Sequence, residues 1–242
     1  MTQLEYVLPG EIEKRSFEII DAQCRELGLP PLSDDIRPVV YRAIHTSADF
    51  DYYENLKFSD GAVPLAHTLL KEGATIVTDT NMGLAGINKT ALKKLGARAV
   101  CFMADPDVAR ASSENGTTRA ASSVDRAAQL EGPVIYAVGN APTALVRLSE
   151  LIESGAFRPA LVIGVPVGFV NVTAAKEMIM EAGVPYIVAV GRKGGSNIAA
   201  AIINALMYET LKEAGSVPDE NRNCSVSQVV SDPVFEYNKY VR

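Results

Sequence analysis

The sequence of 242 residues is poor in the side chains that metal and redox sites need. Its three cysteines, Cys24, Cys101 and Cys224, are isolated and lack the spacing of a metal site. An odd number of scattered thiols favours reduced side chains in a cytosolic setting. Cys101 lies in an apolar run, which predicts a small buried side chain. We therefore expect no metal site.

Long apolar runs and an excess of basic residues are also absent. The first residues, MTQLEYVLPGEIEKRSF, contain no apolar signal core, and no run approaches the length of a membrane-spanning helix. The chain has 23 Lys and Arg against 29 Asp and Glu, which argues against nucleic acid as the main partner. These features predict a soluble cytoplasmic protein without a membrane or nucleic-acid partner. An anionic ligand would need a locally basic pocket.

Several common catalytic and nucleotide-binding fingerprints are missing as well. The chain has neither G-x-G-x-x-G nor the phosphate loop G-x-x-x-x-G-K-[ST], and no acidic residue follows the first predicted strand at ribose-binding distance. It shows no nucleophile elbow, no paired catalytic carboxylates and no His/Cys metal cluster. What remains is one poised histidine, several arginines and many hydroxyl and backbone donors. That set suits a proton-assisted rearrangement better than hydrolysis or redox chemistry.

Five short apolar runs rich in β-branched residues alternate with helical stretches from residue 61 onward. The runs lack polar alternation, which is typical of a parallel sheet covered on both faces. This alternation predicts a doubly wound α/β fold, and we expect a flavodoxin-like five-stranded parallel sheet in the order 2-1-3-4-5. The predicted strands are Thr75–Asp79, Arg98–Ala104, Val134–Val138, Leu161–Val165 and Tyr186–Val190, and the predicted helices among them cover 83–95, 117–130, 142–154, 172–182 and 196–214.

The first 60 residues predict an N-terminal helical extension beside the sheet. Apolar spacing indicates helices over 11–28 and 35–45, the second with Pro38 in its first turn. A polar, aromatic-bearing loop is expected over 49–58, followed by a helix over 61–71. We predict one domain of residues 1–242, with the α/β core at 61–214. The tail at 215–242 is expected to be peripheral or to serve a subunit contact.

Two glycine-bearing loops, Pro166–Asn171 and Gly191–Asn197, follow the last two predicted strands. Both would open on the carboxyl edge of the sheet, where open α/β sheets bind ligands. In GRKGGSN, glycines allow close backbone approach and free N–H groups at the helix start attract anions. Arg192 and Lys193 add positive charge. The loop therefore predicts an anion site, for either a carboxylate or a phosphate.

The two histidines carry the side chain best suited to proton transfer near neutral pH. His45 ends the second predicted helix, beside Arg42 and Thr46. A helix C-terminus favours the protonated imidazole, so His45 could act as a weak acid. Either histidine could instead be satisfied in the core or at a helix end. The apolar neighbours of His67 favour that structural role.

Polar residues at two other strand ends have both structural and functional interpretations. In Thr78–Gly83, the Asp, Thr and Asn could face a ligand or serve as ordinary N-caps. In Val138–Thr143, Asn140 is a good N-cap and Pro142 fits the first turn of a helix, so structure alone accounts for this motif.

Arg119 stands at the start of the predicted helix 117–130. An arginine there is poorly placed for the helix macrodipole, which indicates a role in binding an anion. The alternative is a solvated side chain paired with Asp107 or Asp125.

Seven stretches together resemble the precorrin-8X methylmutases, or cobalt-precorrin-8 methylmutases, of cobalamin biosynthesis. They run from Ile12 to Leu206, nearly the whole chain, and read IEKRSFEII, RAIHTSADFDY, VTDTNMGLAGINK, TTRAASSVDRA, AVGNAPTAL, GVPVGFVNVTAAKE and GRKGGSNIAAAIINAL. The resemblance implies a flavodoxin-like homodimer with active sites at the subunit interface. It also implies migration of a methyl group from C-11 to C-12 of a tetrapyrrole ring, a [1,5]-sigmatropic shift without a redox or metal cofactor.

The resemblance places the catalytic histidine at His45. Its imidazole would protonate or hydrogen-bond a pyrrole-type nitrogen near the migrating methyl, which makes the conjugated ring more electron-poor. Cationic side chains would meet the acetate and propionate groups of the polycarboxylate substrate, and small or apolar residues would contact its ring. The implied substrate-binding residues are Ser16, Arg42, Thr80, Met82, Leu84, Arg119, Arg192, Lys193, Gly194 and Gly195.

Two other functional interpretations stay open. A non-catalytic tetrapyrrole or corrinoid-binding protein could keep the same pocket without the chemistry, and the presence of His45 favours the enzyme over it. A nucleotide-dependent oxidoreductase could use the same fold class, and the missing dinucleotide fingerprint counts against it.

Overall fold

The computed structural model describes residues 5–215 of the chain. Cys224 and the tail beyond Gly215 lie outside the described residues. Among those described, no helix is both long enough and apolar enough to span a bilayer.

A six-stranded sheet forms the centre of the described structure. Its strands are β1 (Leu56–Phe58), β2 (Thr75–Thr78), β3 (Arg98–Val100), β4 (Val134–Val138), β5 (Leu161–Gly164) and β6 (Tyr186–Ala189). They lie in the order β1-β6-β5-β4-β2-β3, and every neighbouring pair is parallel except β1 with β6. The five parallel strands thus follow the expected order 2-1-3-4-5. The predicted number of strands is wrong, because β1 adds a sixth, antiparallel strand.

The predicted loop over 49–58 is also wrong. This segment forms a short helix, α3 (Tyr52–Asn55), and then β1, which pairs Leu56 with Ala189 of β6. Leu56 is buried whereas Lys57 is exposed. A three-residue strand at a sheet edge has too little alternation to stand out in a sequence.

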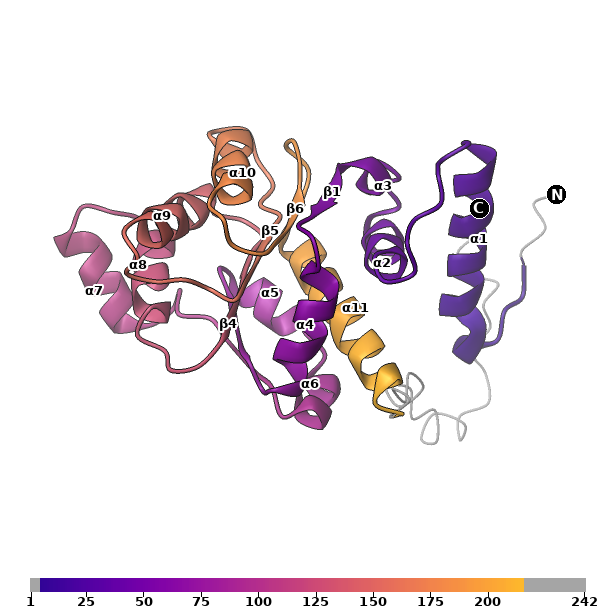
Figure 1. Cartoon of the computed structure of the whole chain (residues 1–242), viewed down its shortest axis with the longest axis horizontal. Helices are drawn as coiled ribbons and strands as arrows, with labels where there is room; N and C mark the ends of the chain where they lie inside the picture. Colours follow the sequence, from indigo (N-terminus) through magenta and orange to yellow (C-terminus); the bar gives the residue numbers. More distant parts are fainter. Residues whose placement is uncertain (1–4, 216–242) are drawn as a thin grey trace, which may run out of the picture.

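Helices cover both faces of the sheet, as expected (Figure 1). One face carries α4, α5, α6 and α11, and the other carries α8, α9 and α10. The helices α1, α2 and α3 lie at one end of the molecule, and α7 lies at the other. Their bounds are α1 (Ile12–Glu26), α2 (Arg37–Ser47), α4 (Ala62–Lys71), α5 (Asn81–Gly86), α6 (Lys89–Leu95), α7 (Pro106–Glu114), α8 (Arg119–Ala127), α9 (Pro142–Glu153), α10 (Val172–Glu181) and α11 (Ser196–Glu213), with a short 3-10 turn η1 (Pro9–Glu11) before α1.

Three local predictions need correction. The expected helix over 83–95 is two helices, because α5 ends at Gly86 and Asn88 caps α6 by accepting a hydrogen bond from the Ala91 N–H at 3.0 Å. The helix α7 was not expected, although Asp105 and Pro106 form an ordinary helix start. The strand β3 stops at Val100, so Cys101 lies in the following loop and is only partly buried.

Alternate residues of each strand supply two apolar layers. Ile76, Ile135 and Ile163 pack on the side of α4 and α11, whereas Tyr136 and Val162 pack on the side of α9 and α10. The strands β2, β4 and β5 are buried along their whole length. This burial on both faces explains why their sequences are continuous apolar runs. The sheet is therefore a rigid base for the loops at its carboxyl edge.

Candidate functional site

The loops at the carboxyl edge of the sheet pack backbone against backbone. A Cβ on Gly139, after β4, would lie 2.6 Å from the Ser196 Cα. A Cβ on Gly194, after β6, would lie only 2.0 Å from the Val165 carbonyl oxygen. The Gly195 N–H donates to that same oxygen at 2.9 Å. Only glycine fits at these two positions without moving a neighbouring loop.

Asp79 joins the loop after β2 to the loop after β4. Its carboxylate is 2% exposed and accepts hydrogen bonds from the N–H groups of Gly139, Asn140 and Ala141 at 2.7–2.8 Å. Burial raises the pKa of the Asp79 carboxyl, and the three donors oppose that rise. The predicted N-cap role of Asn140 is wrong, because Ala141 is the N-cap of α9 and has no side-chain bond. Asp79 satisfies these donors instead, while Pro142 begins the helix as predicted.

Thr80 is the N-cap of α5 and also reaches α11. Its hydroxyl accepts a hydrogen bond from the Gly83 N–H at 3.0 Å and lies 2.7 Å from the Ser196 hydroxyl. This contact joins the loop after β2 to the glycine-rich loop after β6. Next to it, Met82 is 69% exposed and Leu84 is partly buried.

Lys176 is a site component that the sequence interpretation missed. It lies on α10 with 1% of its surface exposed, and its ammonium donates to the carbonyl oxygens of Gly191 at 2.8 Å and Lys193 at 2.9 Å. Burial lowers the pKa of Lys176 to about 8. The helical spacing of Val172, Ala175, Lys176 and Ile179 places this lysine in the buried stripe of α10, and that anomaly is visible in the sequence.

Large apolar side chains are exposed at the same edge. Phe169 is 82% exposed and Val170 is 77% exposed, both in the loop between β5 and α10. The Arg192 guanidinium carbon lies 5.6 Å from the centre of the Phe169 ring. A flat apolar ligand with anionic groups would find both kinds of contact here.

Arg119 begins α8 and is exposed. Neither acid that could pair with it does so, because Asp107 binds Arg110 at 2.9 Å and Asp125 binds Arg147 at 2.8 Å. A hydrogen bond of 2.9 Å between the Thr118 and Thr143 hydroxyls sets this helix start beside that of α9. Arg119 thus lies at the carboxyl edge of the sheet, and we keep it as a predicted anion ligand.

His45 lies in the last turn of α2, and its side chain is exposed. Its ring meets the Phe17 ring of α1 edge to face, with centres 5.6 Å apart. Burial and then the positive charge of Arg42 lower the pKa of His45. The helix ends at Ala48, which has a φ of 55°, an uncommon conformation for a residue with a side chain. This turn leads the chain from His45 to α3 and the carboxyl edge.

Lys193 ties the loop after His45 to the glycine-rich loop. Its ammonium lies 2.6 Å from Asp49 and 2.5 Å from Asp51. The hydrogen bonds that the ammonium donates to these two carboxylates raise the pKa of Lys193. The side chain remains 48% exposed, so a substrate carboxylate would compete with the two acids for it.

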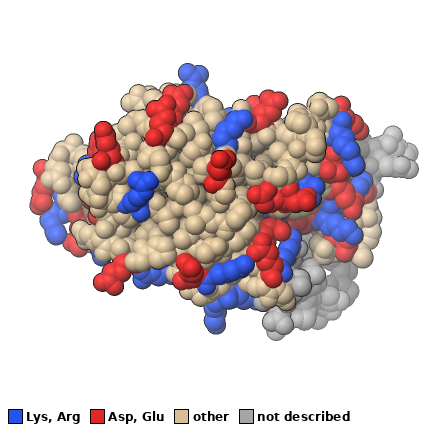
Figure 2. Space-filling model, viewed as in Figure 1, with Lys and Arg blue, Asp and Glu red and all other residues tan. Residues whose placement is uncertain are grey.

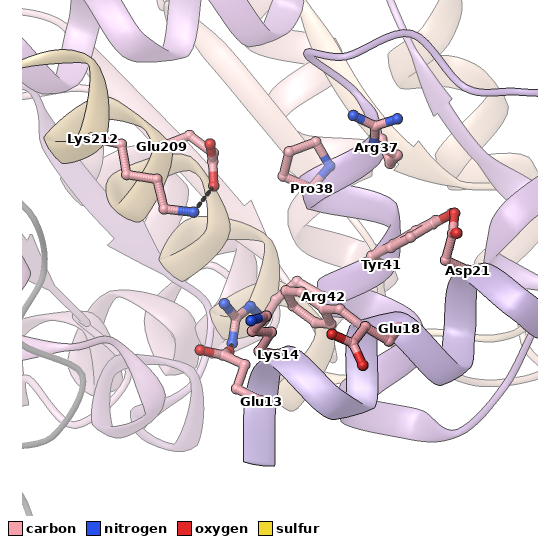
Figure 3. Close-up of a pocket in the computed structure, with 11 residues that line it drawn as sticks. Glu13, Lys14, Glu18, Asp21, Arg37, Pro38, Tyr41, Arg42, Glu209 and Lys212 are labelled. Carbon is pink, nitrogen blue, oxygen red and sulfur yellow. Dashed lines mark hydrogen bonds and ion pairs between the residues drawn. The ribbon is translucent and has the colours of Figure 1, made fainter. Parts of the chain in front are cut away.

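A cleft of about 630 Å³ lies among α1, α2 and α11, and Arg42 lines it (Figure 3). Arg42 is ion-paired with Glu13 and stacks between the rings of Phe17 and Tyr208, at 5.0 and 5.2 Å from their centres. Ser16 is on α1, where its hydroxyl bonds the Ile12 carbonyl at 2.8 Å. Figure 2 shows charged side chains of both signs gathered at this end of the molecule.

His67 has the structural role that its neighbours indicated. It is buried on α4, and its Nδ1 lies 2.7 Å from the Thr210 hydroxyl, which in turn donates to the Leu206 carbonyl. Burial lowers the pKa of His67. Of the two histidines, only His45 is exposed.

The predicted site residues form two groups in the described structure. Thr80, Gly194 and Gly195 lie at the carboxyl edge of the sheet, as do Met82, Leu84, Arg119 and Arg192. Ser16, Arg42 and His45 form a second group on α1 and α2. The contacts of Lys193 with Asp49 and Asp51 join the two.

Comparison with known proteins gives a consistent result. A family model described as CbiC, precorrin-8X methylmutase, matches residues 11–209. The chain is 44% identical over 214 residues to the cobalt-precorrin-8 methylmutase of Salmonella typhimurium, covering 85% of this chain and 97% of that one. It is 38% identical over 210 residues to the precorrin-8X methylmutase of Pseudomonas aeruginosa, with 85% and 99% covered. A crystal structure of a precorrin-8X methylmutase from Thermus thermophilus aligns with a TM-score of 0.74 at 43% identity, covering 86% of this chain and 100% of that one.

Proposed function

The chain belongs to the precorrin-8X methylmutase family, and we propose that it moves a methyl group from C-11 to C-12 of precorrin-8X or its cobalt form. It is thus an isomerase of cobalamin biosynthesis, and the product would be hydrogenobyrinate or cobyrinate. The observation that carries the proposal is the family match over residues 11–209, and an exposed histidine in the last turn of α2 supports it.

His45 is proposed to donate a proton, or a hydrogen bond, to a pyrrole-type nitrogen of the substrate. A proton there draws electron density from the conjugated ring, so the bond from the methyl to C-11 breaks more easily as the bond to C-12 forms. The proton returns to the imidazole afterwards, because substrate and product have the same composition. A lowered pKa makes the His45 imidazolium a stronger acid, and the carboxylates of a bound substrate would favour its protonated form.

The cationic and apolar residues are proposed to bind and orient the macrocycle. Arg119, Arg192 and Lys193 would meet acetate and propionate groups by charge-assisted hydrogen bonds. Met82, Leu84 and Thr80 would contact the ring. The glycines at 194 and 195 would let the ring approach the backbone. Arg42 would hold α1 against α11 and, through its charge, keep the pKa of His45 low.

The test of this role uses two substitutions at His45 and one control. Loss of a general acid slows a reaction by about 10²–10⁴-fold, so we expect His45→Ala to lose turnover by that factor while still binding cobyrinic acid. His45→Gln keeps a hydrogen-bond donor without an acidic proton, and turnover above that of His45→Ala would indicate that hydrogen bonding contributes. The control, His67→Asn, removes the other histidine and should leave turnover unchanged. Wild-type turnover in His45→Ala would refute the role.

We also propose that the enzyme is a cytoplasmic homodimer with the site at the subunit interface. Each subunit would be one domain of residues 1–242. The exposed side chains of Phe169, Val170 and Met82 at the sheet edge support this, because patches of this kind mark interaction sites. Light scattering should give the mass of a dimer, and Phe169→Asp should shift it toward the monomer. The mass of a monomer for the unmodified chain would contradict the proposal.

A further inference from the structure

The ammonium of Lys176 fixes the direction of two peptide groups in the loop after β6. It donates to the carbonyl oxygens of Gly191 and Lys193, which are two residues apart in the chain. In a trans peptide the C=O of one residue and the N–H of the next point in opposite directions. The N–H groups of Arg192 and Gly194 therefore both point away from Lys176.

These two N–H groups have no acceptor among the described residues. The neighbouring N–H of Gly195 donates to the Val165 carbonyl, but neither Arg192 nor Gly194 donates through its backbone to any described group. Arg192 is exposed and Gly194 is partly buried, so neither residue is sealed in the core. Backbone N–H groups of a turn that lack an acceptor in the protein can bind an anion.

We infer that Lys176 is a positioning residue, and that the loop it holds presents the N–H groups of Arg192 and Gly194 as a binding site for one carboxylate of the substrate. The inference rests on the proposed function, since it takes the tetrapyrrole polycarboxylate as the ligand. Lys176 itself is buried behind the loop and does not touch the substrate.

The surroundings of Lys176 support this role. No carboxylate among the described residues forms an ion pair with it, so its charge is offset only by carbonyl dipoles. Keeping an ammonium at 1% exposure without a counter-ion costs free energy. A residue that served packing alone could be apolar and would avoid this cost. The positive charge of Lys176 lies directly behind the two N–H groups, where it strengthens their attraction for an anion. Gly168 holds the loop as well, because its N–H donates to the Arg192 carbonyl at 3.2 Å.

The experiment compares two ligands on three variants. The ligands are cobyrinic acid and its fully methyl-esterified form, which has the same ring without the carboxylates. The variants are Lys176→Met, which has nearly the same length without charge or donors, Lys176→Gln, which keeps donors without charge, and the control Lys94→Met, at an exposed lysine of α6. Affinity is measured by absorbance titration, and turnover is measured on precorrin-8X.

We expect Lys176→Met to weaken binding of the acid about tenfold or more, the effect of losing charge-assisted hydrogen bonds, and to leave binding of the ester unchanged. The KM should rise more than the kcat falls. The affinity of Lys176→Gln for the acid should lie between those of the unmodified protein and Lys176→Met. This variant provides the test by itself if Lys176→Met does not fold. Equal loss of affinity for acid and ester would show a merely structural role and overturn the inference, as would unchanged binding of the acid. Failure of the unmodified protein to isomerise both precorrin-8X and its cobalt form would instead overturn the proposed function.

Discussion

Replacement of Asp79 by Asn tests how the carboxyl edge of the sheet is assembled. Asp79 is 2% exposed, and its two carboxylate oxygens accept three backbone hydrogen bonds. An amide has one acceptor oxygen. If that oxygen takes the bonds from Asn140 and Ala141, the amide NH₂ faces the Gly139 N–H, which loses its acceptor at a buried position.

The magnitude follows from the bonds that are lost. A hydrogen bond to a charged group contributes about 1.5–3 kcal/mol, and an unsatisfied buried donor costs about 1–3 kcal/mol. Removing the buried charge recovers part of its desolvation cost, which is the effect that raises the pKa of Asp79. We expect a net loss of about 2–4 kcal/mol in the free energy of unfolding. For a chain of this size, that corresponds to a Tm lower by roughly 4–16 °C.

Urea unfolding at neutral pH measures the loss, and Asp60→Asn on the exposed surface is the matched control, with no expected change. Hydrogen exchange gives a local measurement, because the amides of Gly139, Asn140 and Ala141 should exchange faster in the variant. A stability equal to or above that of the wild type would show that desolvation outweighs the three bonds. That result would refute the argument that Asp79 organises this edge.

Three further predictions concern the glycine-rich loop and the two histidines. Gly194→Ala should lower both stability and affinity for cobyrinic acid, because its Cβ would lie 2.0 Å from the Val165 carbonyl oxygen. The control Gly191→Ala has nothing within 4 Å of the new Cβ, so it should cost only the strain of its φ, about 1 kcal/mol in stability. Equal effects of the two substitutions would contradict the packing argument. Because burial and Arg42 lower the pKa of His45 from 6.5, kcat/KM should fall as the pH rises through that lowered value; a profile unchanged in His45→Gln would exclude His45 as the acid. Burial likewise lowers the pKa of His67 from 6.5, so the unfolded chain binds a proton before the folded chain does as the pH falls, and the free energy of unfolding should decrease below about pH 6.5. His67→Asn should flatten this pH dependence in urea titrations. An unchanged slope in the variant would contradict the assignment to His67.

The parallel strands could be predicted because burial on both faces forces continuous apolar sequences. Val134–Val138 is buried at every position, and its bounds agree with the prediction. β1 could not be predicted, because it is stabilised by pairing with β6, which lies far along the chain, and not by its own three residues. Its pairing brings the segment that follows His45 to the carboxyl edge of the sheet.

Individual residues at the sheet edge could be identified from the sequence, but their hydrogen-bond and packing partners could not. The glycines of GRKGGSN indicated close backbone approach, which the contact of Gly194 with Val165 explains. Asp79 was interpreted as either a cap or a ligand-facing residue, because the N–H groups that donate to it lie about 60 residues further along the chain. Lys176 gave a detectable signal, a lysine in an apolar stripe, whereas its two carbonyl partners depend on the tertiary structure.

Incubation of the purified chain with precorrin-8X, and separately with its cobalt form, tests the central claim most directly. The account predicts a change in the absorption spectrum with no change in mass, and a product whose migrated methyl is found at C-12 by NMR of labelled substrate. An unchanged spectrum with both substrates, under conditions in which the Salmonella typhimurium relative is active, would contradict it.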